Sequence, residues 1–439
     1  MAIKFPSHGV DNPDYELDRG RYANVSSRVP EIDRGTSEPR GCKEQRLPIV
    51  VIGMFIVAVL FTASLSLLPD PSSDVPLVPV PVGIYYTSHT NISIDGNAQF
   101  NNTNFPNNGV VSGNGSASNP FIIEGWDISA VAATGIYIRN TNAHFVVRDC
   151  YVHDGRYGSP FSFIGISLLA CANGTISNNI CLSDAYGIYL RSSVNSIISD
   201  NNCSNGILGI YLATSSNDYT MINNTCLSNS NDGIEISESS GNLINNICSN
   251  NGRGIYIRMS SSNNVINNTC SSNTYDGVVV GSSGGNTLIN NNCSNNNQRG
   301  MWIVDSSGET VALNRICNNT LQGVYLQSGS NNRFWNNTFN GNNGGGIQAQ
   351  DDGTSNWWNT SGSPHGYGNW WSDLTSPDAN SDGIVDWSYN LTGTSGAKDY
   401  YPLTTPLVLI PEFGGMQFMV MVLLVATMLI GEARRRKAS

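Results

Sequence analysis

Charged side chains are scarce in this sequence of 439 residues, of which Asp, Glu, Lys and Arg make up 13%. Basic residues are especially few away from the two ends, because positions 71–412 hold 10 basic and 23 acidic residues and carry a net charge of −13. Proteins that bind nucleic acid need patches of Lys and Arg to neutralise phosphates. The shortage of basic side chains therefore argues against nucleic acid as a partner.

A regular fold is expected despite the composition. The chain has 45 Gly and long stretches rich in Asn and Ser, a composition also found in disordered segments. Disordered segments lack regularly spaced Ile, Val, Leu and aromatic residues, and here such residues recur throughout the middle of the chain. The sequence thus favours a repetitive folded protein.

Two uncharged apolar runs have the length of membrane spans. Residues 49–68 form a run of 20, enough to cross about 30 Å of hydrocarbon. Arg40, Lys43 and Arg46 precede this run, so the positive-inside rule places the polar and disordered tail 1–48 in the cytoplasm. A cleaved signal peptide is the alternative, but it seldom follows so long a polar segment. The second run, 413–431, precedes a basic cluster that should also stay inside, so we predict a protein of the cell membrane with its middle part outside the cell.

Asn-x-Ser/Thr sequences agree with this placement, since they are acceptors for N-glycosylation in exported chains. Many arise by chance in a chain this rich in Asn and Ser, so they permit glycosylation without establishing it. In the part of the chain predicted to lie outside the cell they occur at Asn91, Asn101, Asn114, Asn173, Asn202, Asn223, Asn267, Asn292, Asn318, Asn336, Asn359 and Asn390.

An internal repeat dominates the middle of the sequence. A Gly followed by alternating apolar residues recurs at spacings of 30, 22, 22, 24, 21, 23, 23, 23 and 23 residues. A second motif, apolar-x-Asn-Asn-x-Cys, lies between these positions, for example at 221–226 and 243–248. The repeated glycines are Gly135, Gly165, Gly187, Gly209, Gly233, Gly254, Gly277, Gly300, Gly323 and Gly346.

These patterns predict an all-β fold. Alternation with period 2 indicates strands, and units of about two dozen residues are too short for a crossover helix. One unit cannot bury its own apolar face, so neighbouring units must stack around a common core. We predict a right-handed parallel β-helix solenoid of about ten coils, with two short strands in each coil, flanked by two transmembrane helices.

The predicted domain organisation follows from these signals. After the tail (1–48) and the transmembrane signal-anchor (49–68) comes a Pro-rich external linker (69–90), then an N-terminal cap with the first coil (91–134). The β-helix repeats occupy 135–350, and a C-terminal capping segment occupies 351–405. Residues 406–439 hold a sorting signal or a transmembrane anchor.

Strand parity predicts which Asn side chains face the core. The first Asn of the second motif has the same parity as the apolar residue, so it should point inward and join a ladder of buried amides. The Asn that follows should adopt the αL conformation and turn the chain. The predicted ladder comprises Asn178, Asn223, Asn245, Asn267, Asn290, Asn314 and Asn336.

Cysteine follows the same repeat. An even number of Cys outside the cell is typical of disulfides, but identical positions on adjacent parallel strands aim their Cβ atoms poorly for a bridge. We expect buried free thiols that act as small apolar side chains, and a ladder that binds a soft metal is the alternative. The predicted inward column comprises Cys150, Cys181, Cys203, Cys226, Cys248, Cys270, Cys293 and Cys317.

Two end segments resemble a known family. GVVSGNGSASNPFIIEGWDISA (109–130) and GNWWSDLTSPDANSDGIVDWSYN, followed by DYYPL, are similar to the first coil and the closing segment of archaeal NosD-like surface proteins with parallel β-helix (PbH1) repeats. The resemblance covers about residues 93–402. The family is named after a periplasmic protein associated with copper delivery, which implies copper handling as an alternative function. The five histidines do not match a copper site, because they are scattered at His8, His89, His144, His153 and His365.

The C-terminal tail resembles an archaeal surface-sorting signal. Pro411, Glu412 and Phe413 precede an apolar span and a basic cluster. The resemblance implies cleavage near these three residues and transfer to a lipid anchor. A plain transmembrane anchor is the alternative.

One loop has the residue pattern of a calcium site. Oxygen ligands at positions 1, 3, 5, 7 and 9 match such a loop, although Tyr389 stands where a bidentate Glu is expected. We predict a structural calcium ion at the C-terminal end of the solenoid, and a turn rich in Asx motifs is the alternative. The predicted ligands are Asp378, Asn380, Asp382, the carbonyl of Ile384, and Asp386.

Aromatic residues recur at the middle position of the Gly-led strands, which points outward. An exposed aromatic stripe can stack on sugar rings or dock a partner, although contacts between adjacent strands explain it without a ligand. The predicted binding face comprises Tyr137, Tyr189, Tyr211, Tyr256, Trp302 and Tyr325, in a column with Ser167, Glu235, Val279 and Gln348, and with Arg139, Arg191 and Arg258 two residues further on. Trp357, Trp358, Trp370 and Trp371 should cover the last open coil.

Catalysis is the alternative to binding. β-Helix lyases and hydrolases need convergent carboxylates, and the longer coil around RDCYVHDGRYG offers Asp149, His153 and Asp154, with Asp184 one coil away. A surface loop of solvated charges is the simpler explanation. We therefore expect a surface β-helix that serves envelope structure, adhesion, or the binding of glycans or other envelope proteins, with a polysaccharide lyase or hydrolase as the alternative.

Overall fold

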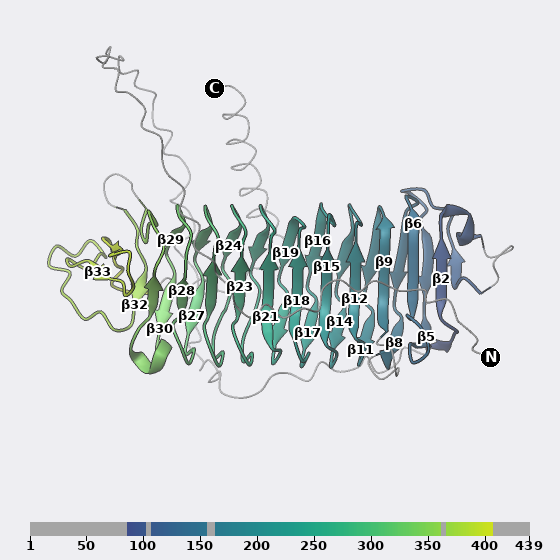
Figure 1. Cartoon of the computed structure of the whole chain (residues 1–439), viewed down its shortest axis with the longest axis horizontal. Helices are drawn as coiled ribbons and strands as arrows, with labels where there is room; N and C mark the ends of the chain where they lie inside the picture. The colour runs from purple at the N-terminus through teal and green to yellow at the C-terminus, as the bar shows by residue number, and fades with distance from the viewer. Residues whose placement is uncertain (1–85, 102–106, 156–162, 361–365, 407–439) are drawn as a thin grey trace, which may run out of the picture. The chain divides into compact units, whose positions relative to one another are not determined.

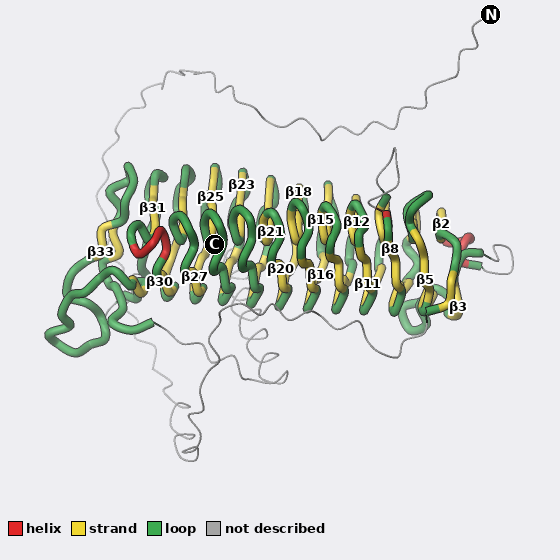
Figure 2. The backbone as a smooth tube through the Cα atoms, turned by 90° about the horizontal axis from the view of Figure 1, so that it is seen from below, coloured by secondary structure: helices red, strands yellow, loops and turns green. Residues whose placement is uncertain are grey.

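The computed structural model describes residues 86–101, 107–155, 163–360 and 366–406. The predicted cytoplasmic tail, both predicted membrane spans and the predicted sorting signal lie outside these ranges. Within them, no helix is long and apolar enough to cross a bilayer. The described residues form a stack of coils that runs from β2 at one end to β33 at the other (Figures 1 and 2).

Three β-sheets, here called A, B and C, form the walls of this stack, and their strands pair in parallel except for the antiparallel pair β3–β4. Each coil passes through one strand of sheet B, one of sheet C and one of sheet A before the next coil begins. The predicted all-β parallel β-helix is therefore confirmed. The prediction of two strands per unit is wrong, because a residue with positive φ divides the second motif into a strand of sheet C and a strand of sheet A.

The strands are short, as expected for a solenoid. Sheet B contains β2 (Ile92–Asp95), β6 (Ile136–Thr141), β9 (Ile164–Cys171), β12 (Tyr186–Arg191), β15 (Leu208–Ala213), β18 (Asp232–Ser237), β21 (Arg253–Arg258), β23 (Val278–Gly281), β25 (Met301–Val304), β28 (Val324–Leu326) and β31 (Ala349–Asp351). Sheet C contains β3 (Val110–Ser112), β4 (Phe121–Glu124), β7 (Phe145–Arg148), β10 (Gly174–Ser177), β13 (Ile197–Ser199), β16 (Tyr219–Ile222), β19 (Gly241–Ile244), β22 (Asn264–Ile266), β24 (Thr287–Ile289), β26 (Thr310–Ala312) and β29 (Arg333–Trp335). Sheet A contains β1 (Thr87–Ser88), β5 (Trp126–Ser129), β8 (Tyr151–His153), β11 (Ile180–Leu182), β14 (Asn202–Ser204), β17 (Thr225–Leu227) and β20 (Ile247–Ser249), and single bridges continue this wall to β27 (Arg315–Cys317), β30 (Thr338–Asn340) and β32 (Trp370–Trp371).

The core consists of like side chains stacked in columns. In sheet B, Ile188 pairs with Ile210 and Leu190 pairs with Leu212, and all four are fully buried. The residue between each inward pair points outward, as alternation in a strand requires. The apolar face that one coil exposes is covered by the next coil, and this mutual burial drives the stacking.

Asn314 lies in the buried amide ladder as predicted, but in the other coils the ladder lies one residue later than the sequence predicted. Asn223, Asn245, Asn267 and Asn290, predicted inside, adopt the αL conformation at the corner between sheets C and A, with φ between 56° and 59°. A residue in this conformation reverses the side-chain parity, so the Asn after it points inward. Each ladder amide except the last, Asn369, donates from Nδ2 to Oδ1 of the next Asn over 2.9–3.1 Å. The ladder comprises Asn179, Asn201, Asn224, Asn246, Asn268, Asn291, Asn314, Asn337 and Asn369.

Two further corners carry amide ladders of the same kind. The corner that follows sheet A stacks Asn229, Asn251, Asn273, Asn296, Asn319 and Asn342. The corner that precedes sheet C stacks Asn263, Asn286, Glu309, Asn332 and Asn356. Every turn of the coil is thus fixed by buried side chains that satisfy backbone N–H groups.

Stacked aromatic rings close the C-terminal end of the core. The Phe334 ring stacks on Trp358 at 4.0 Å, and Trp371 stacks on Phe339 at 4.4 Å and on Tyr389 at 4.0 Å. Tyr389 belongs to β33 (Tyr389–Asn390), which pairs with β34 (Lys398–Asp399). At the other end, Phe100 of the 3-10 helix η1 (Asn97–Phe100) stacks on Phe121 at 4.6 Å.

Candidate functional site

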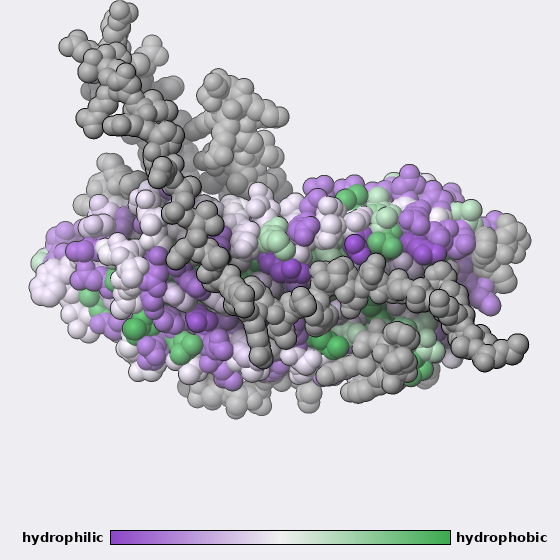
Figure 3. Space-filling model, viewed as in Figure 1, coloured by the Kyte–Doolittle hydropathy of each residue, from purple (hydrophilic) through white to green (hydrophobic). Residues whose placement is uncertain are grey.

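The outward column of sheet B runs the length of the solenoid. Strand register places Ser93, Tyr137, Ser167, Tyr189, Tyr211, Glu235, Tyr256, Val279, Trp302, Tyr325 and Gln350 side by side on successive strands. All six aromatic residues of the predicted binding face stand in this column, and each is half-buried. The visible surface of the stack is mainly hydrophilic, with small separate hydrophobic patches (Figure 3).

Gln348 does not belong to this column, so its placement there is wrong. The 3-10 helix η3 (Asn342–Gly345) shifts the register of the last coil, so Gln350 pairs with Tyr325 instead. Gln348 is fully buried and its Oε1 accepts the Nδ2 of Asn342 at 3.0 Å. The side chain therefore ends the amide ladder that follows sheet A.

Three tyrosines gather on the adjacent strands β12 and β15 of sheet B. The Tyr189 and Tyr211 rings lie 5.3 Å apart, and Tyr186 lies 5.8 Å from each of them. We call Tyr186, Tyr189 and Tyr211 the tyrosine cluster. The sequence prediction missed Tyr186, because this residue stands before the repeated Gly187 and so lies outside the alternating run that follows the Gly. Only its ring contacts with Tyr189 and Tyr211 reveal its place beside them, because strand parity groups Tyr186 with the inward Ile188.

Most charged residues on the strands of sheet B, or just before them, form pairs across adjacent coils. Arg253 donates two hydrogen bonds to buried Asp232 over 2.6 and 3.0 Å. The remaining pairs are Arg258 with Glu235 at 2.9 Å, Arg299 with Asp276 at 3.3 Å and Arg139 with Asp95 at 2.9 Å. Burial raises the pKa of Asp232 to about 6, although the Arg253 guanidinium opposes this shift.

Several of these guanidinium groups also lie over aromatic rings. Arg253 lies 4.2 Å from the centre of the Tyr256 ring, and Arg299 lies 4.9 Å from Trp302 and 5.2 Å from Tyr325. Such contacts hold both partners in place. Sheet B therefore presents an ordered surface of rings and paired charges.

A second group of functional side chains surrounds His153 on sheet A. Its Nδ1 lies 2.7 Å from Asp154 and its Nε2 lies 3.0 Å from Asp127. Burial alone would lower the pKa of His153, but the hydrogen bonds with Asp154 and Asp127 raise it above its usual value. Because both ring nitrogens face carboxylates, this geometry favours the doubly protonated imidazolium. The ring also stacks on Tyr151 at 4.5 Å.

The other predicted catalytic candidates take different positions. Asp149 accepts a hydrogen bond from Asn178 and lies 3.7 Å from Arg148. It therefore belongs to the corner between sheets C and A and does not contact His153. Asp184 is buried, and its Oδ1 accepts the N–H of Gly155, two residues after His153, at 2.9 Å. Burial raises the pKa of Asp184 to about 7, against the effect of that hydrogen bond.

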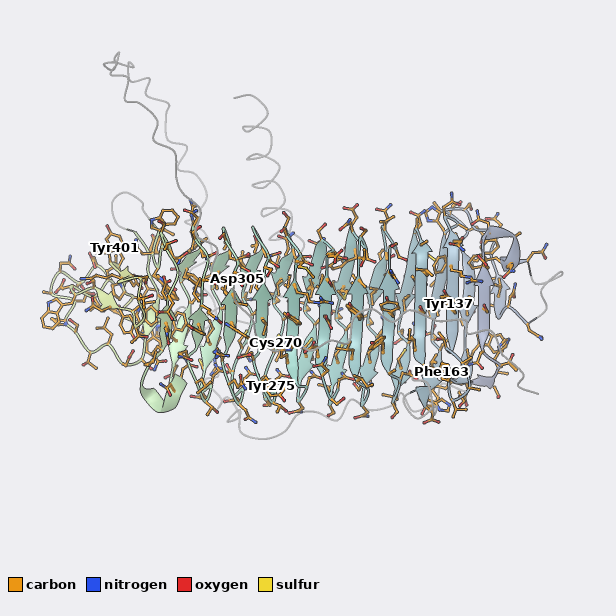
Figure 4. All side chains as sticks on the ribbon, in the orientation of Figure 1. Tyr137, Phe163, Cys270, Tyr275, Asp305 and Tyr401 are labelled. Carbon is orange, nitrogen blue, oxygen red and sulfur yellow. The ribbon has the colours of Figure 1, made fainter. Side chains whose placement is uncertain are left out.

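Six cysteines stack in one column, here called the file, on the inward face of the sheet A wall. Cys181 pairs with Cys203 and Cys226 pairs with Cys248, and strand register continues the file through Cys270 to Cys293. All six are buried and unbridged, and Figure 4 labels Cys270 near the middle of the stack. Burial raises the pKa of Cys248 well above that of an ordinary thiol, so the neutral thiol is the stable form.

Cys150 and Cys317 are not in this file, so that part of the prediction is wrong. Val152 pairs with Cys181, while Cys150 takes the corner position at which its N–H donates to Asn179. In the later coil Ile316 pairs with Phe339, which places Cys317 one residue beyond the column. In each of these coils an apolar side chain fills the core position that Cys occupies elsewhere.

The predicted calcium loop is exposed and satisfied by its own backbone. Asp378 accepts the N–H groups of Asp382 and Gly383 over 3.1 and 2.9 Å, and Asp386 accepts the N–H of Ala379 at 2.9 Å. Across the described ranges, no three His, Cys, Asp or Glu side chains are grouped as metal ligands. A calcium ion bound in this loop would therefore compete with these backbone contacts for the carboxylate oxygens.

Family models match the middle of the sequence. The model of the right handed beta helix region matches residues 208–360, and that of the periplasmic copper-binding protein (NosD) matches residues 144–266. Together with the three-sheet coil, these matches show that the described residues form a NosD-like right-handed parallel β-helix. None of the curated proteins matches the sequence.

The chain is also similar to solved structures of low sequence identity. The A-module of the Azotobacter vinelandii mannuronan C-5 epimerase AlgE6 is 18% identical over 54% of this chain and 81% of that chain, with a TM-score of 0.45. A mutant of the periplasmic alginate epimerase AlgG is 17% identical over 54% and 76% of the two chains, with a TM-score of 0.42. The Dettilon tailspike protein is 13% identical over 55% and 56%, with a TM-score of 0.40.

Proposed function

We propose that this protein is a surface β-helix that binds an extended glycan along sheet B. The main evidence for glycan binding is the column of half-buried aromatic side chains. In this column the tyrosine cluster brings three rings within 5.8 Å of one another. Aromatic faces pack against the apolar C–H faces of sugar rings. Because the column repeats at the strand spacing of about 4.8 Å, a polymer laid along the stack meets rings at several points.

The positions of the glycosylation sequences support this choice of surface. None of the twelve acceptor asparagines between Asn91 and Asn390 lies within a strand of sheet B. Asn223 and Asn318 are exposed at corners beside sheet A, and Asn202 is on a strand of that sheet. Glycans attached at these asparagines would leave sheet B open to a ligand.

The proposed location is the outer face of the cell membrane. The apolar runs 49–68 and 413–431 would anchor the chain, and the basic residues beside them would stay in the cytoplasm. The match to a family named for a periplasmic protein supports a solenoid outside the cytoplasm. Cleavage after the Pro411–Phe413 motif would replace the second anchor with a lipid.

A glycan array probed with the full chain in mild detergent tests the binding function. We expect the wild-type protein to bind a subset of extended glycans, and the double variant Tyr189→Ala/Tyr211→Ala to lose that binding. The matched control is Tyr400→Ala, which removes a tyrosine that is 62% exposed in the C-terminal segment. Unchanged binding by the double variant would reject sheet B as the site.

A second candidate function is acid–base catalysis on a polysaccharide at His153. The observation that favours it is the imidazole held between Asp127 and Asp154 at 3.0 and 2.7 Å. A protonated His held in this way can donate a proton to a leaving group. The test is the release of new reducing ends or unsaturated products from the glycans that bind, with His153→Ala compared with His144→Ala. Equal product from both variants, or none from the wild type, would reject this role.

We also propose that the loop 378–386 binds a structural calcium ion. Asp378, Asp382 and Asp386 supply carboxylates at positions 1, 5 and 9 of the loop. The loop adjoins the end of the solenoid, since Val385 donates to the carbonyl of Pro402 at 2.8 Å and Leu403 donates to that of Asn369 at 2.9 Å. An ion here would brace the segment that covers the last coil.

A further inference from the structure

We propose that the tyrosine cluster and Arg191 form a subsite for a negatively charged sugar, so the ligand of sheet B is an acidic glycan. This inference rests on the proposed function and adds the chemical class of the ligand. It combines two observations on the same face. One is the packing of three tyrosine rings, and the other is a single arginine without an acidic partner beside them.

The rings provide the stacking part of the subsite. Tyr189 and Tyr211 stand on adjacent strands with their planes tilted by 38°, and Tyr186 meets Tyr211 edge to face at 76°. Their mutual contacts restrict the rotation of each ring, so little conformational entropy is lost when a sugar packs on them. The Nη2 of Arg258 also donates to the Tyr211 hydroxyl at 3.2 Å and fixes that ring from the far side.

The charge balance of sheet B identifies Arg191 as different from the other arginines. Arg139, Arg253, Arg258 and Arg299 each face a carboxylate within 3.3 Å. Arg191, at the end of β12, is exposed and forms no ion pair with any described residue. The paired arginines and acids neutralise one another, so Arg191 leaves a local positive charge on a chain whose net charge is −11.

The neighbours of Arg191 leave its guanidinium free for a ligand. Strand register places Leu169 on one side of it and Ala213 on the other, and neither carries charge. The exposed acid Glu238 follows β18, two coils further on, which is about 10 Å away at the usual strand spacing. Arg191 also lies two residues after Tyr189, so both side chains leave the same face of the strand.

This arrangement matches the chemistry of an acidic pyranose. A guanidinium group binds a carboxylate or a sulfate through two parallel N–H donors. The ring of the same sugar can then lie on the neighbouring tyrosine. A neutral sugar would use the rings alone, and a polymer of acidic sugars would otherwise be repelled by the net negative charge of the chain.

The test compares charged and neutral forms of one polymer on the full chain in mild detergent. The probes are de-esterified and fully methyl-esterified homogalacturonan, with dextran sulfate and dextran as the sulfate pair. We expect tight binding of a charged member and weaker binding of its neutral partner. Arg191→Gln should weaken binding of the charged polymer about tenfold, which corresponds to the loss of a charged hydrogen-bonded contact.

Matched variants separate this inference from the proposed function. Arg315→Gln removes an exposed arginine of sheet A and should leave binding unchanged. Tyr189→Ala should weaken binding of both polymer forms. Equal binding of charged and neutral polymers, or no effect of Arg191→Gln, would overturn the acidic subsite while leaving glycan binding in place. Failure of the wild type to bind any polymer would overturn both proposals and favour a protein partner for sheet B.

Discussion

The carboxylate of Glu309 accepts the backbone N–H of Asn286 at 2.8 Å, in a corner position that an Asn amide occupies in the coils on either side. An Asn at this position both accepts from the preceding coil and donates from Nδ2, as Asn332 does to Asn356 at 3.1 Å. An ionised Glu can only accept. Glu309 is fully buried, and this burial raises its pKa to about 7 in spite of its hydrogen bonds with Asn286.

Replacing Glu309 with Gln should stabilise the fold at alkaline pH. The folded pKa is raised, so the stability that protonated Glu309 contributes is complete below its ordinary pKa of 4.5 and is lost as pH rises through about 7. At pH 8 the loss amounts to about 3 kcal/mol. Thermal unfolding at pH 4 and pH 8 should therefore show the benefit of Glu309→Gln only at pH 8. Glu124→Gln, on the exposed side of sheet C, is the control, and an equal benefit from both variants would contradict the burial argument.

The amide ladder can be tested with two adjacent asparagines. Asn246→Ala removes the acceptor of both the backbone N–H and the Nδ2 of Asn224, at 3.0 and 2.9 Å. We expect this change to cost about 2–4 kcal/mol in the free energy of unfolding, because several buried polar groups lose their partners. Asn245→Gly should cost much less, since Gly adopts the αL conformation at that corner. Denaturant unfolding of the two variants measures these changes. A larger loss of unfolding free energy for Asn245→Gly would contradict the finding that Asn246, and not Asn245, points into the core.

The file of thiols predicts unreactive cysteines. Cys181, Cys203, Cys226, Cys248, Cys270 and Cys293 are all less than 2% exposed, so none of them should react with an alkylating reagent in the native protein. Mass spectrometry of peptides after labelling in native and denaturing conditions measures this directly. Cys248→Ser should lower the free energy of unfolding by about 1–3 kcal/mol because it buries a hydroxyl group. Rapid labelling of Cys248 in the folded state would show that the core is open.

The proposed calcium loop predicts a stability effect that depends on the ion. Calcium should raise the melting temperature of the wild-type protein, because binding to the folded state alone shifts the unfolding equilibrium. Asp382→Ala should abolish this increase and have little effect when calcium is absent. Asp305→Ala, which removes an exposed acid at a corner of the solenoid, is the control. An equal increase in the wild type and in Asp382→Ala would reject the loop as the site.

The repeat made much of this architecture predictable from the sequence. The spacing of the Gly-led strands predicts the coil, and period 2 predicts that Ile188 faces inward and Tyr189 outward, as the structure shows. The predictions failed where one residue changes the parity or the register. The αL corner at Asn245 moves the buried amide to Asn246, and η3 replaces Gln348 with Gln350 in the outward column. The αL corner and the 3-10 helix depend on contacts with neighbouring coils, and the residue pattern of one coil gives no information about those contacts.

The candidate sites were less predictable than the fold. Adjacent strands bring Asp127 and His153 together from positions 26 residues apart, and only the register of sheet A reveals this contact. The pairing of Asp232 with Arg253 likewise depends on the register of sheet B. Sequence patterns identified the types of residue on each face, whereas the unpaired state of Arg191 required the positions of every other charge on that sheet.

The most direct test of glycan binding by sheet B is hydroxyl-radical footprinting of the full chain with and without a glycan that binds on the array. We expect Tyr186, Tyr189 and Tyr211 to be modified less when the glycan is present, and exposed Trp387 and Tyr400 in the C-terminal segment to be modified to the same extent. Unchanged modification of the three tyrosines, with protection of another surface, would contradict glycan binding by sheet B.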